Sequence, residues 1–179
     1  YFDFFFFFLP EGFDNDRPSK RIHSELEENI AQFAKASELP AVAIQVVNAN
    51  KSIWSAGFGT LGDSGKKIDD RTLFRVGSVT KLFTDMALMQ LVEEGHIDLQ
   101  APVSTYLPTF APRNPFASDI TVEMLLTHRS GLVREPPIGS YFDTSEPPLS
   151  RVVSSLNQTQ LVYSPGSKVQ YSNAALAVI

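Results

Sequence analysis

Residues 75–83 read Arg75-Val76-Gly77-Ser78-Val79-Thr80-Lys81-Leu82-Phe83, and they place a hydroxyl and an amine three positions apart. Apolar residues recur at helical spacing after this stretch, which predicts a helix from Ser78 to about Glu94 that Gly95 ends. Residues three apart lie on one helix face, so Ser78 and Lys81 can meet. The serine is either a helix N-cap or a nucleophile, since a serine hydroxyl reacts only when a neighbouring group takes its proton.

A lysine amine takes up that proton only where burial or a nearby cation favours its neutral form. We expect Val79, Leu82 and Phe83 to supply this burial around Lys81. The start of the predicted helix adds partial positive charge and free N–H groups, which favour an oxyanion developing near Ser78. The local sequence is therefore compatible with nucleophilic catalysis.

The composition excludes several other chemistries. The chain has 179 residues, no cysteine, 43% hydrophobic residues and a formal net charge of −5, which indicates one globular domain or part of one. Disulfides, thiolate catalysis and cysteine-ligated zinc are thereby excluded. The three histidines are scattered, and no basic cluster suits phosphate, so we expect no metal, no cofactor and no nucleic acid.

Residues 1–18 form an apolar N-terminal extension that begins with a nearly unbroken aromatic run, Tyr1 to Leu9. Nine residues are too few to cross a bilayer, which takes about 20 as a helix. The run is compatible with a remnant of a signal segment, an anchor stub or an arm on another chain. Membrane anchoring is therefore an open expectation, and the extension is left out of the fold prediction.

The sequence before Ser78 predicts a helix and a hairpin. Residues 19–37 have helical apolar spacing, and 41–47 and 53–58 read as two strands, the first of them buried on both faces. The run Gly57 to Gly62 formally matches a dinucleotide-binding glycine motif, but a polar turn follows it where that motif requires a helix. We therefore expect no dinucleotide site.

The sequence after the long helix predicts short helices joined by loops. Tyr171 and Asn173 lie two residues apart, a spacing that places both on one side of an extended segment. The phenol could shuttle a proton, and the amide could hold Lys81 and a substrate carbonyl. The alternative is a core tyrosine beside a helix-capping asparagine. The predicted segments are helices near 121–126 and 149–156, a proline-rich loop at 134–148, and a buried helix after Asn173.

Three stretches, 77–83, 125–132 and 165–176, together resemble the serine β-lactamase-like superfamily. The most similar branch contains class C β-lactamases, D-alanyl-D-alanine carboxypeptidases, D-aminopeptidases and carboxylesterases. The resemblance implies an α+β, β-lactamase/transpeptidase-like fold, with an antiparallel sheet flanked by helices and a helical subdomain. Residues 19–179 are then the N-terminal portion of a single catalytic domain, with 19–77 its helix-and-sheet part and 78–179 its mostly helical part.

The resemblance also implies roles for four residues. Ser78 is the acylated nucleophile, Lys81 its partner, Tyr171 the general acid and base, and Asn173 binds Lys81 and the substrate. The backbone N–H of Ser78 supplies half of an oxyanion hole, and the stretch containing His128 and Gly131 is structural. The implied reaction is hydrolysis of an ester or amide in a small-molecule or peptide substrate, with a non-catalytic binding or scaffold protein as the alternative.

The superfamily carries a third motif, Lys or His followed by a small residue and Gly, on a strand far beyond the tyrosine. Only six residues follow Asn173 here, so we expect about half a domain, with the remainder a separate chain or missing. Loss of one oxyanion donor costs about 10²–10³ in rate, so this chain alone should react slowly. The habit of the superfamily implies a secreted, periplasmic or membrane-anchored protein.

Overall fold

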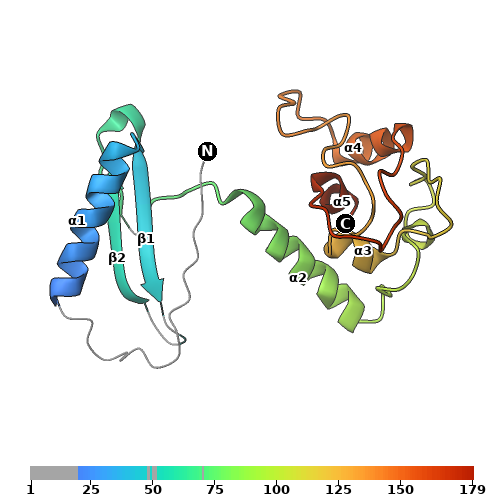
Figure 1. Cartoon of the computed structure of the whole chain (residues 1–179), viewed down its shortest axis with the longest axis horizontal. Helices are drawn as coiled ribbons and strands as arrows, with labels where there is room; N and C mark the ends of the chain where they lie inside the picture. The colour runs from blue at the N-terminus through green and yellow to red at the C-terminus, as the bar shows by residue number, and fades with distance from the viewer. Residues whose placement is uncertain (1–19, 48, 50–51, 70) are drawn as a thin grey trace. The chain divides into compact units, whose positions relative to one another are not determined.

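The computed structural model describes residues 20–47, 49, 52–69 and 71–179, which form two compact units (Figure 1). The units are Tyr1–Arg75 and Val76–Ile179, and each is described by itself. The predicted extension 1–18 lies outside the described residues. The assignment of 19–179 to a single catalytic domain stays a prediction.

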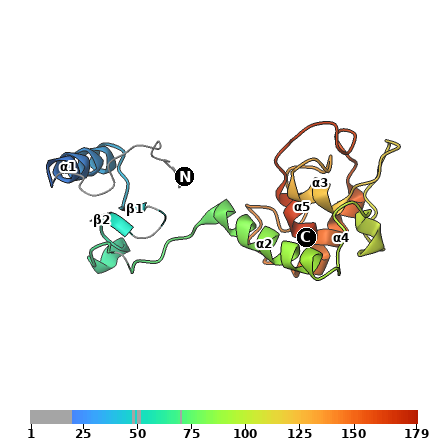
Figure 2. The ribbon, with the colours of Figure 1, turned by 90° about the horizontal axis from the view of Figure 1, so that it is seen from below.

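The first unit is a helix packed along an antiparallel hairpin. Helix α1 spans Lys20–Ala36, and strands β1 (Ala41–Val47) and β2 (Ser52–Gly59) pair from Ala41 opposite Gly59 to Val47 opposite Ser52. Helix α1 runs beside the strands (Figures 1 and 2), and the indole N–H of Trp54 donates to the carboxylate of Glu27 at 3.1 Å. The predicted helix and hairpin are therefore present.

The prediction that the first strand is buried on both faces was wrong. Along β1 the side chains alternate between half-buried and exposed, and Ala43, Gln45 and Val47 are exposed. The reason is that α1 packs on the hairpin, whereas no second layer covers it among the described residues of this unit. The apolar sequence of this strand therefore predicts more burial than the other elements of its unit provide.

The glycine-rich run ends the second strand and does not open an α-helix. Gly57 and Gly59 belong to β2, and Gly62 begins a single 3₁₀ turn, Gly62–Ser64. A phosphate-binding glycine motif needs the N-terminus of a following helix, so this geometry gives no such site.

The second unit consists of one long helix and a group of short helices, and the short helices surround a small core. Helix α2 spans Thr80–Glu93, α3 Val122–Leu126, α4 Leu149–Ser155 and α5 Asn173–Val178. The 3₁₀ turns lie at Gly77–Val79, Val103–Thr105 and Leu156–Gln158. Helix α5 packs against α3 and α4, and the fully buried side chains around it include Leu125, Leu132, Leu156 and Leu161.

Helix α2 begins two residues later than predicted. Ser78 lies in the 3₁₀ turn before it, and the α2 N-cap, Val79, makes no side-chain capping bond. Serine capping is thereby excluded at this helix start, and the Ser78 hydroxyl is left to contact other side chains.

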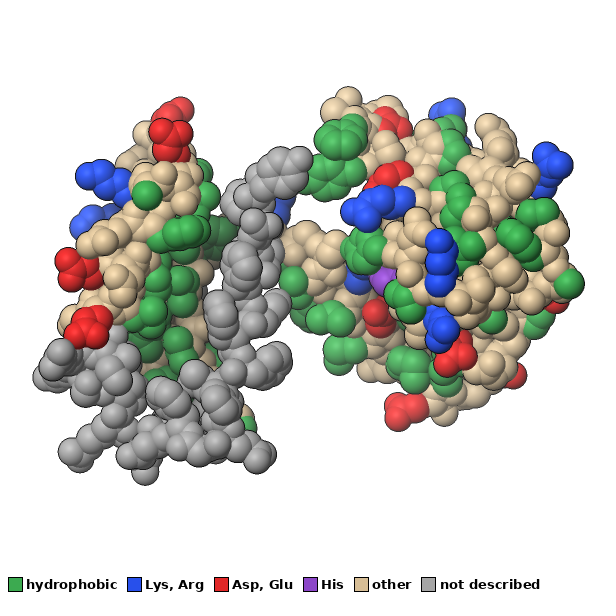
Figure 3. All heavy atoms as spheres, in the orientation of Figure 1, with side chains coloured by type: hydrophobic (Ala, Val, Ile, Leu, Met, Phe, Trp, Pro, Cys, Tyr) green, Lys and Arg blue, Asp and Glu red, His purple; other side chains and the backbone are tan. Residues whose placement is uncertain are grey.

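Much of the apolar side of α2 is uncovered within its unit. Leu88 is the buried residue of this helix, whereas Leu82 and Phe83 are 60% and 68% exposed. The predicted burial of Lys81 by Leu82 and Phe83 was therefore wrong for this unit. Hydrophobic side chains reach the surface of both units (Figure 3).

The described residues contain neither a membrane-spanning helix nor a cluster of metal-binding side chains. No helix in them has both the length and the apolar character needed to cross a bilayer. The same part of the chain brings together no group of three or more histidine and carboxylate side chains that could hold a metal ion.

Candidate active site

The structure brings Ser78, Lys81 and Tyr171 together at one oxygen atom. The Ser78 hydroxyl oxygen accepts a hydrogen bond from the Lys81 ammonium at 3.1 Å and one from the Tyr171 phenol at 2.6 Å. Ser78 comes from the 3₁₀ turn, Lys81 from the first turn of α2, and Tyr171 from the extended segment before α5. Both groups therefore lie within hydrogen-bonding distance of the hydroxyl whose proton a nucleophilic serine has to give up.

Two cations lie against the ring of Tyr171. The Lys81 ammonium is 5.0 Å from the ring centroid, and the Arg134 guanidinium carbon is 5.3 Å from it. Cations within about 6 Å of an aromatic ring are attracted by its quadrupole. Two positively charged side chains therefore lie beside the ring of the site tyrosine.

His128 contacts each residue of the segment 170–172. Its ring lies 4.4 Å from that of Tyr171, its carbonyl accepts from the Gln170 N–H at 2.8 Å, and its Nδ1 accepts from the Ser172 N–H at 3.3 Å. Because Nδ1 accepts, the ring hydrogen of the neutral imidazole is on Nε2. The backbone of His128 holds a left-handed conformation, with φ at 56°.

Burial lowers the pKa of His128 below its ordinary value, and the charge of Lys81 lowers that pKa further. The negative charge of Asp85 acts in the opposite direction on the pKa and is the weaker influence. A neutral His128 suits the site, because protonation at Nδ1 would remove the acceptor that the Ser172 N–H uses. The stretch that the sequence marked as structural therefore holds the site tyrosine in place.

Asn173 is the first residue of α5, and its side chain bonds to Glu135. Its amide Nδ2 donates to the carboxylate of Glu135 at 2.6 Å, and its backbone N–H donates to the carbonyl of Arg134 at 2.8 Å. The expected hydrogen bond to Lys81 is not formed among the described residues. A bond to a carboxylate is charge-assisted, which explains why the amide takes Glu135 as its partner.

Arg134 and Glu135 are the residues that sequence reasoning missed. They begin the proline-rich loop 134–148, where neither helical nor strand periodicity marks a position. The sequence offers one sign of them, a pair of adjacent charged residues three and four positions after Gly131. This pair follows closely on the stretch 125–132, which carries one of the family motifs. Their contact with 171–173 appears only when the chain folds back on itself.

Ser172 lies between the two site residues and is fully buried. Its hydroxyl donates to the carbonyl of Val133 at 2.7 Å and accepts from the N–H of Ala175 at 3.0 Å, so it is the N-cap of α5. Ser172 thus fixes both the start of α5 and the loop that carries Arg134. The alternative that Asn173 caps this helix was therefore wrong, because the neighbouring Ser172 is the N-cap.

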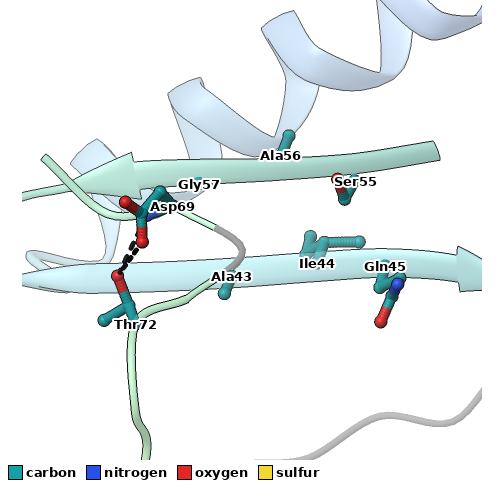
Figure 4. Close-up of a pocket in the computed structure, with 8 residues that line it drawn as sticks. All are labelled: Ala43, Ile44, Gln45, Ser55, Ala56, Gly57, Asp69 and Thr72. Carbon is teal, nitrogen blue, oxygen red and sulfur yellow. Dashed lines mark hydrogen bonds between the residues drawn. The ribbon is translucent and has the colours of Figure 1, made fainter.

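A separate hollow of about 460 Å³ lies on the hairpin of the first unit (Figure 4). Asp69 and Thr72 hydrogen bond to each other at its edge, and the bond from the Thr72 hydroxyl is the main reason why the pKa of Asp69 is lowered. None of the predicted site residues lines this hollow. The lining residues are Ala43, Ile44, Gln45, Ser55, Ala56, Gly57, Asp69 and Thr72.

A serine hydroxyl that is hydrogen-bonded to both a lysine and a tyrosine defines a class of site in which the serine can act as nucleophile and the other two side chains can carry protons. Residues 26–179 match the family model described as Beta-lactamase, and the chain belongs to this family. The match covers both the hairpin unit and the unit that carries the candidate site.

Named relatives include two hydrolases. Esterase EstB of Burkholderia gladioli is 34% identical over 125 residues, which cover 63% of this chain and 32% of that protein. Unguisins hydrolase ungD of Aspergillus violaceofuscus is 30% identical over 174 residues, 92% of this chain and 30% of that protein. The chain spans about a third of the length of these curated relatives.

Solved structures confirm the predicted fold class, α+β and β-lactamase/transpeptidase-like. EstCE1, a hydrolase with promiscuous acyltransferase activity, superposes with a TM-score of 0.73 at 25% identity, covering 87% of this chain and 45% of that one. The β-lactamase/D-alanine carboxypeptidase of Yersinia pestis gives a TM-score of 0.68 at 24% identity, covering 89% and 49%.

Proposed function

We propose that the protein is a serine hydrolase that forms an acyl-enzyme on Ser78 and cleaves an ester or amide. The observation that carries the proposal is the pair of hydrogen bonds from Lys81 and Tyr171 to the Ser78 hydroxyl oxygen. Family membership and the hydrolases among the relatives support it. The natural substrate is proposed only as a class, a small molecule or peptide with a scissile ester or amide.

The proposed reaction has two balanced steps. In the first, the Ser78 oxygen bonds to the substrate carbonyl carbon, its proton passes to the Lys81–Tyr171 pair, and the bond to the leaving group breaks as that pair returns a proton to the leaving alcohol or amine. In the second, water attacks the acyl carbon, gives its proton to the same pair and releases the acid, while Ser78 regains its hydrogen. Proton transfer of this kind contributes about 10²–10⁴ in rate.

One observation favours the alternative of a non-catalytic binding protein. The side chain of Asn173, expected to hold Lys81 and the substrate, is engaged with Glu135 in the described structure. A scaffold protein would tolerate that arrangement, whereas an enzyme would have to exchange Glu135 for substrate.

Intact-mass spectrometry after incubation with a fluorophosphonate separates the two functions. The chain should gain one adduct mass, and the Ser78→Ala variant should gain none. Ser118→Ala is the matched control, because Ser118 is an exposed serine of the same unit whose hydroxyl has no hydrogen bond among those found in the described residues. Labelling that survives Ser78→Ala, or no labelling of either this folded chain or the full-length protein, would contradict the hydrolase and leave the binding protein.

A further inference from the structure

Arg134 is anchored beside the candidate site through its backbone. Its carbonyl accepts from the N–H of Asn173 at 2.8 Å and from the N–H of Ala174 at 3.2 Å, which ties it to the first turn of α5. Its side chain then turns back to the ring of Tyr171, with the guanidinium carbon 5.3 Å from the centroid. A replacement of the side chain leaves both backbone bonds in place.

The guanidinium of Arg134 has unused hydrogen-bonding capacity. The side chain is 66% exposed, and its described ion pair is the contact of Nε with the Glu135 carboxylate at 3.7 Å. That carboxylate oxygen also accepts from Asn173 at 2.6 Å, the shorter of its two contacts. The terminal amino groups of Arg134 donate to no acceptor among the described residues.

The charges around Tyr171 favour an anion. Lys81 and Arg134 both lie against one ring, and the hydroxyl of that ring is bonded to the Ser78 oxygen. Lys81 is committed to the hydroxyl of Ser78, whereas Arg134 touches neither Ser78 nor Lys81 in the described hydrogen bonds. The planar fork of an arginine binds a carboxylate through two parallel hydrogen bonds, a geometry that a lysine lacks.

We infer that Arg134 is a specificity-determining residue that binds a carboxylate of the substrate next to Ser78. The inference rests on the proposed function and narrows it to esters or amides that carry a free carboxylate. Glu135 acts in this site as the group that holds Arg134 until the substrate carboxylate replaces the long ion pair.

The test compares how tightly two ligands bind, benzylpenicillin, which carries a free carboxylate, and its methyl ester, in which that negative charge is absent. Binding is measured by ligand-observed NMR on the Ser78→Ala chain, which cannot be acylated there. We expect the carboxylate to bind roughly tenfold more tightly than the ester, as one charge-assisted hydrogen-bonded pair provides. Adding Arg134→Ala should bring the ratio of the two affinities close to one, because it weakens the binding of the carboxylate and leaves that of the ester unchanged. Arg134→Lys should restore part of the preference for the carboxylate.

Arg129→Ala on the same background is the matched control, since Arg129 is an exposed arginine of the same unit that contacts no site residue through its side chain in the described structure. It should keep the full preference. Equal binding of the two penicillins, or a preference that survives Arg134→Ala, would overturn the inference.

Fluorophosphonate labelling of the unmutated chain separates this failure from that of the proposed function. A labelled Ser78 with no preference for the carboxylate would retain the hydrolase and remove the carboxylate site. A preference that depends on Arg134, in a chain that is never labelled, would retain the carboxylate site and remove the hydrolase.

Discussion

The phenol oxygen of Tyr171 lies 2.6 Å from the hydroxyl oxygen of Ser78, although the two residues are 93 positions apart in the chain. Lys81 reaches the same oxygen from one helical turn away. The site thus combines a local pair, held by the 3₁₀ turn and the first turn of α2, with a distant partner that the packing of α5 on α3 and α4 brings close.

Replacing Tyr171 by Phe should slow fluorophosphonate labelling of Ser78 by about 10²–10⁴, because the ring stays packed on His128 while the proton carrier is lost. The rate is followed by intact mass at fixed reagent concentration. Tyr141→Phe is the control, since Tyr141 is a tyrosine of the same unit that is 83% exposed. An unchanged rate in Tyr171→Phe would show that the phenol does not take part.

Lys81→Met should slow the same labelling by about 10²–10⁴, because methionine retains the stem of the side chain and removes the amine that binds Ser78. The matched change is Lys168→Met, at a lysine whose ammonium lies over the ring of Tyr163, 4.6 Å from its centroid. Equal rates for the two variants would contradict the role of Lys81.

Stability should fall as the pH drops below about 6.5, the ordinary pKa of His128, because burial holds that pKa lower in the folded protein. Between the lowered and the ordinary pKa the unfolded chain binds more protons than the folded one, so stability rises with pH in this window. It is fully present above about pH 6.5 and is lost as the pH falls through the lowered value.

The measurement is urea unfolding, followed by circular dichroism, at several pH values between 5 and 8. The variant His128→Asn removes the titrating ring and suits the left-handed backbone, so the pH dependence should flatten. His96→Asn, at an exposed histidine, should leave it unchanged. A pH dependence that persists in His128→Asn would refute this assignment.

Ser172→Ala should reduce the free energy of unfolding by about 1–2 kcal/mol, since it removes an N-cap and leaves the carbonyl of the half-buried Val133 without its donor. Circular dichroism is the appropriate signal, because the single tryptophan, Trp54, belongs to the hairpin unit. Ser154→Ala, at an exposed serine of α4, should cost less than half as much. Equal costs would mean that α5 does not depend on this cap.

Gly131→Ala should cost more than about 2 kcal/mol, because φ is 79° there and a Cβ would overlap the carbonyl oxygen of Tyr163. Gly95→Ala isolates the backbone strain alone, since φ is 75° and no atom lies near the position of a Cβ. Its cost should be nearer 1 kcal/mol. If the two variants lose the same stability, the close approach of Tyr163 carries no energetic weight.

The elements that could be predicted from the amino-acid sequence are those with local causes. Apolar spacing predicted α1, α2 and the hairpin, and the spacing of Ser78 and Lys81 predicted their contact, because one helical turn decides it. The motifs in 77–83, 125–132 and 165–176 predicted the family. The proposed roles of Ser78, Lys81, Tyr171 and Asn173 stay predictions until the labelling experiments are done.

The side-chain partners and the burial could not be predicted in this way, because both depend on how segments far apart in the chain pack together. The tertiary structure turned Asn173 towards Glu135, set His128 against Tyr171, and carried Arg134 back to the same ring. It also left β1 and the apolar side of α2 less buried than their sequences predict, since a hydrophobic pattern states which side chains favour burial but not whether another element covers them.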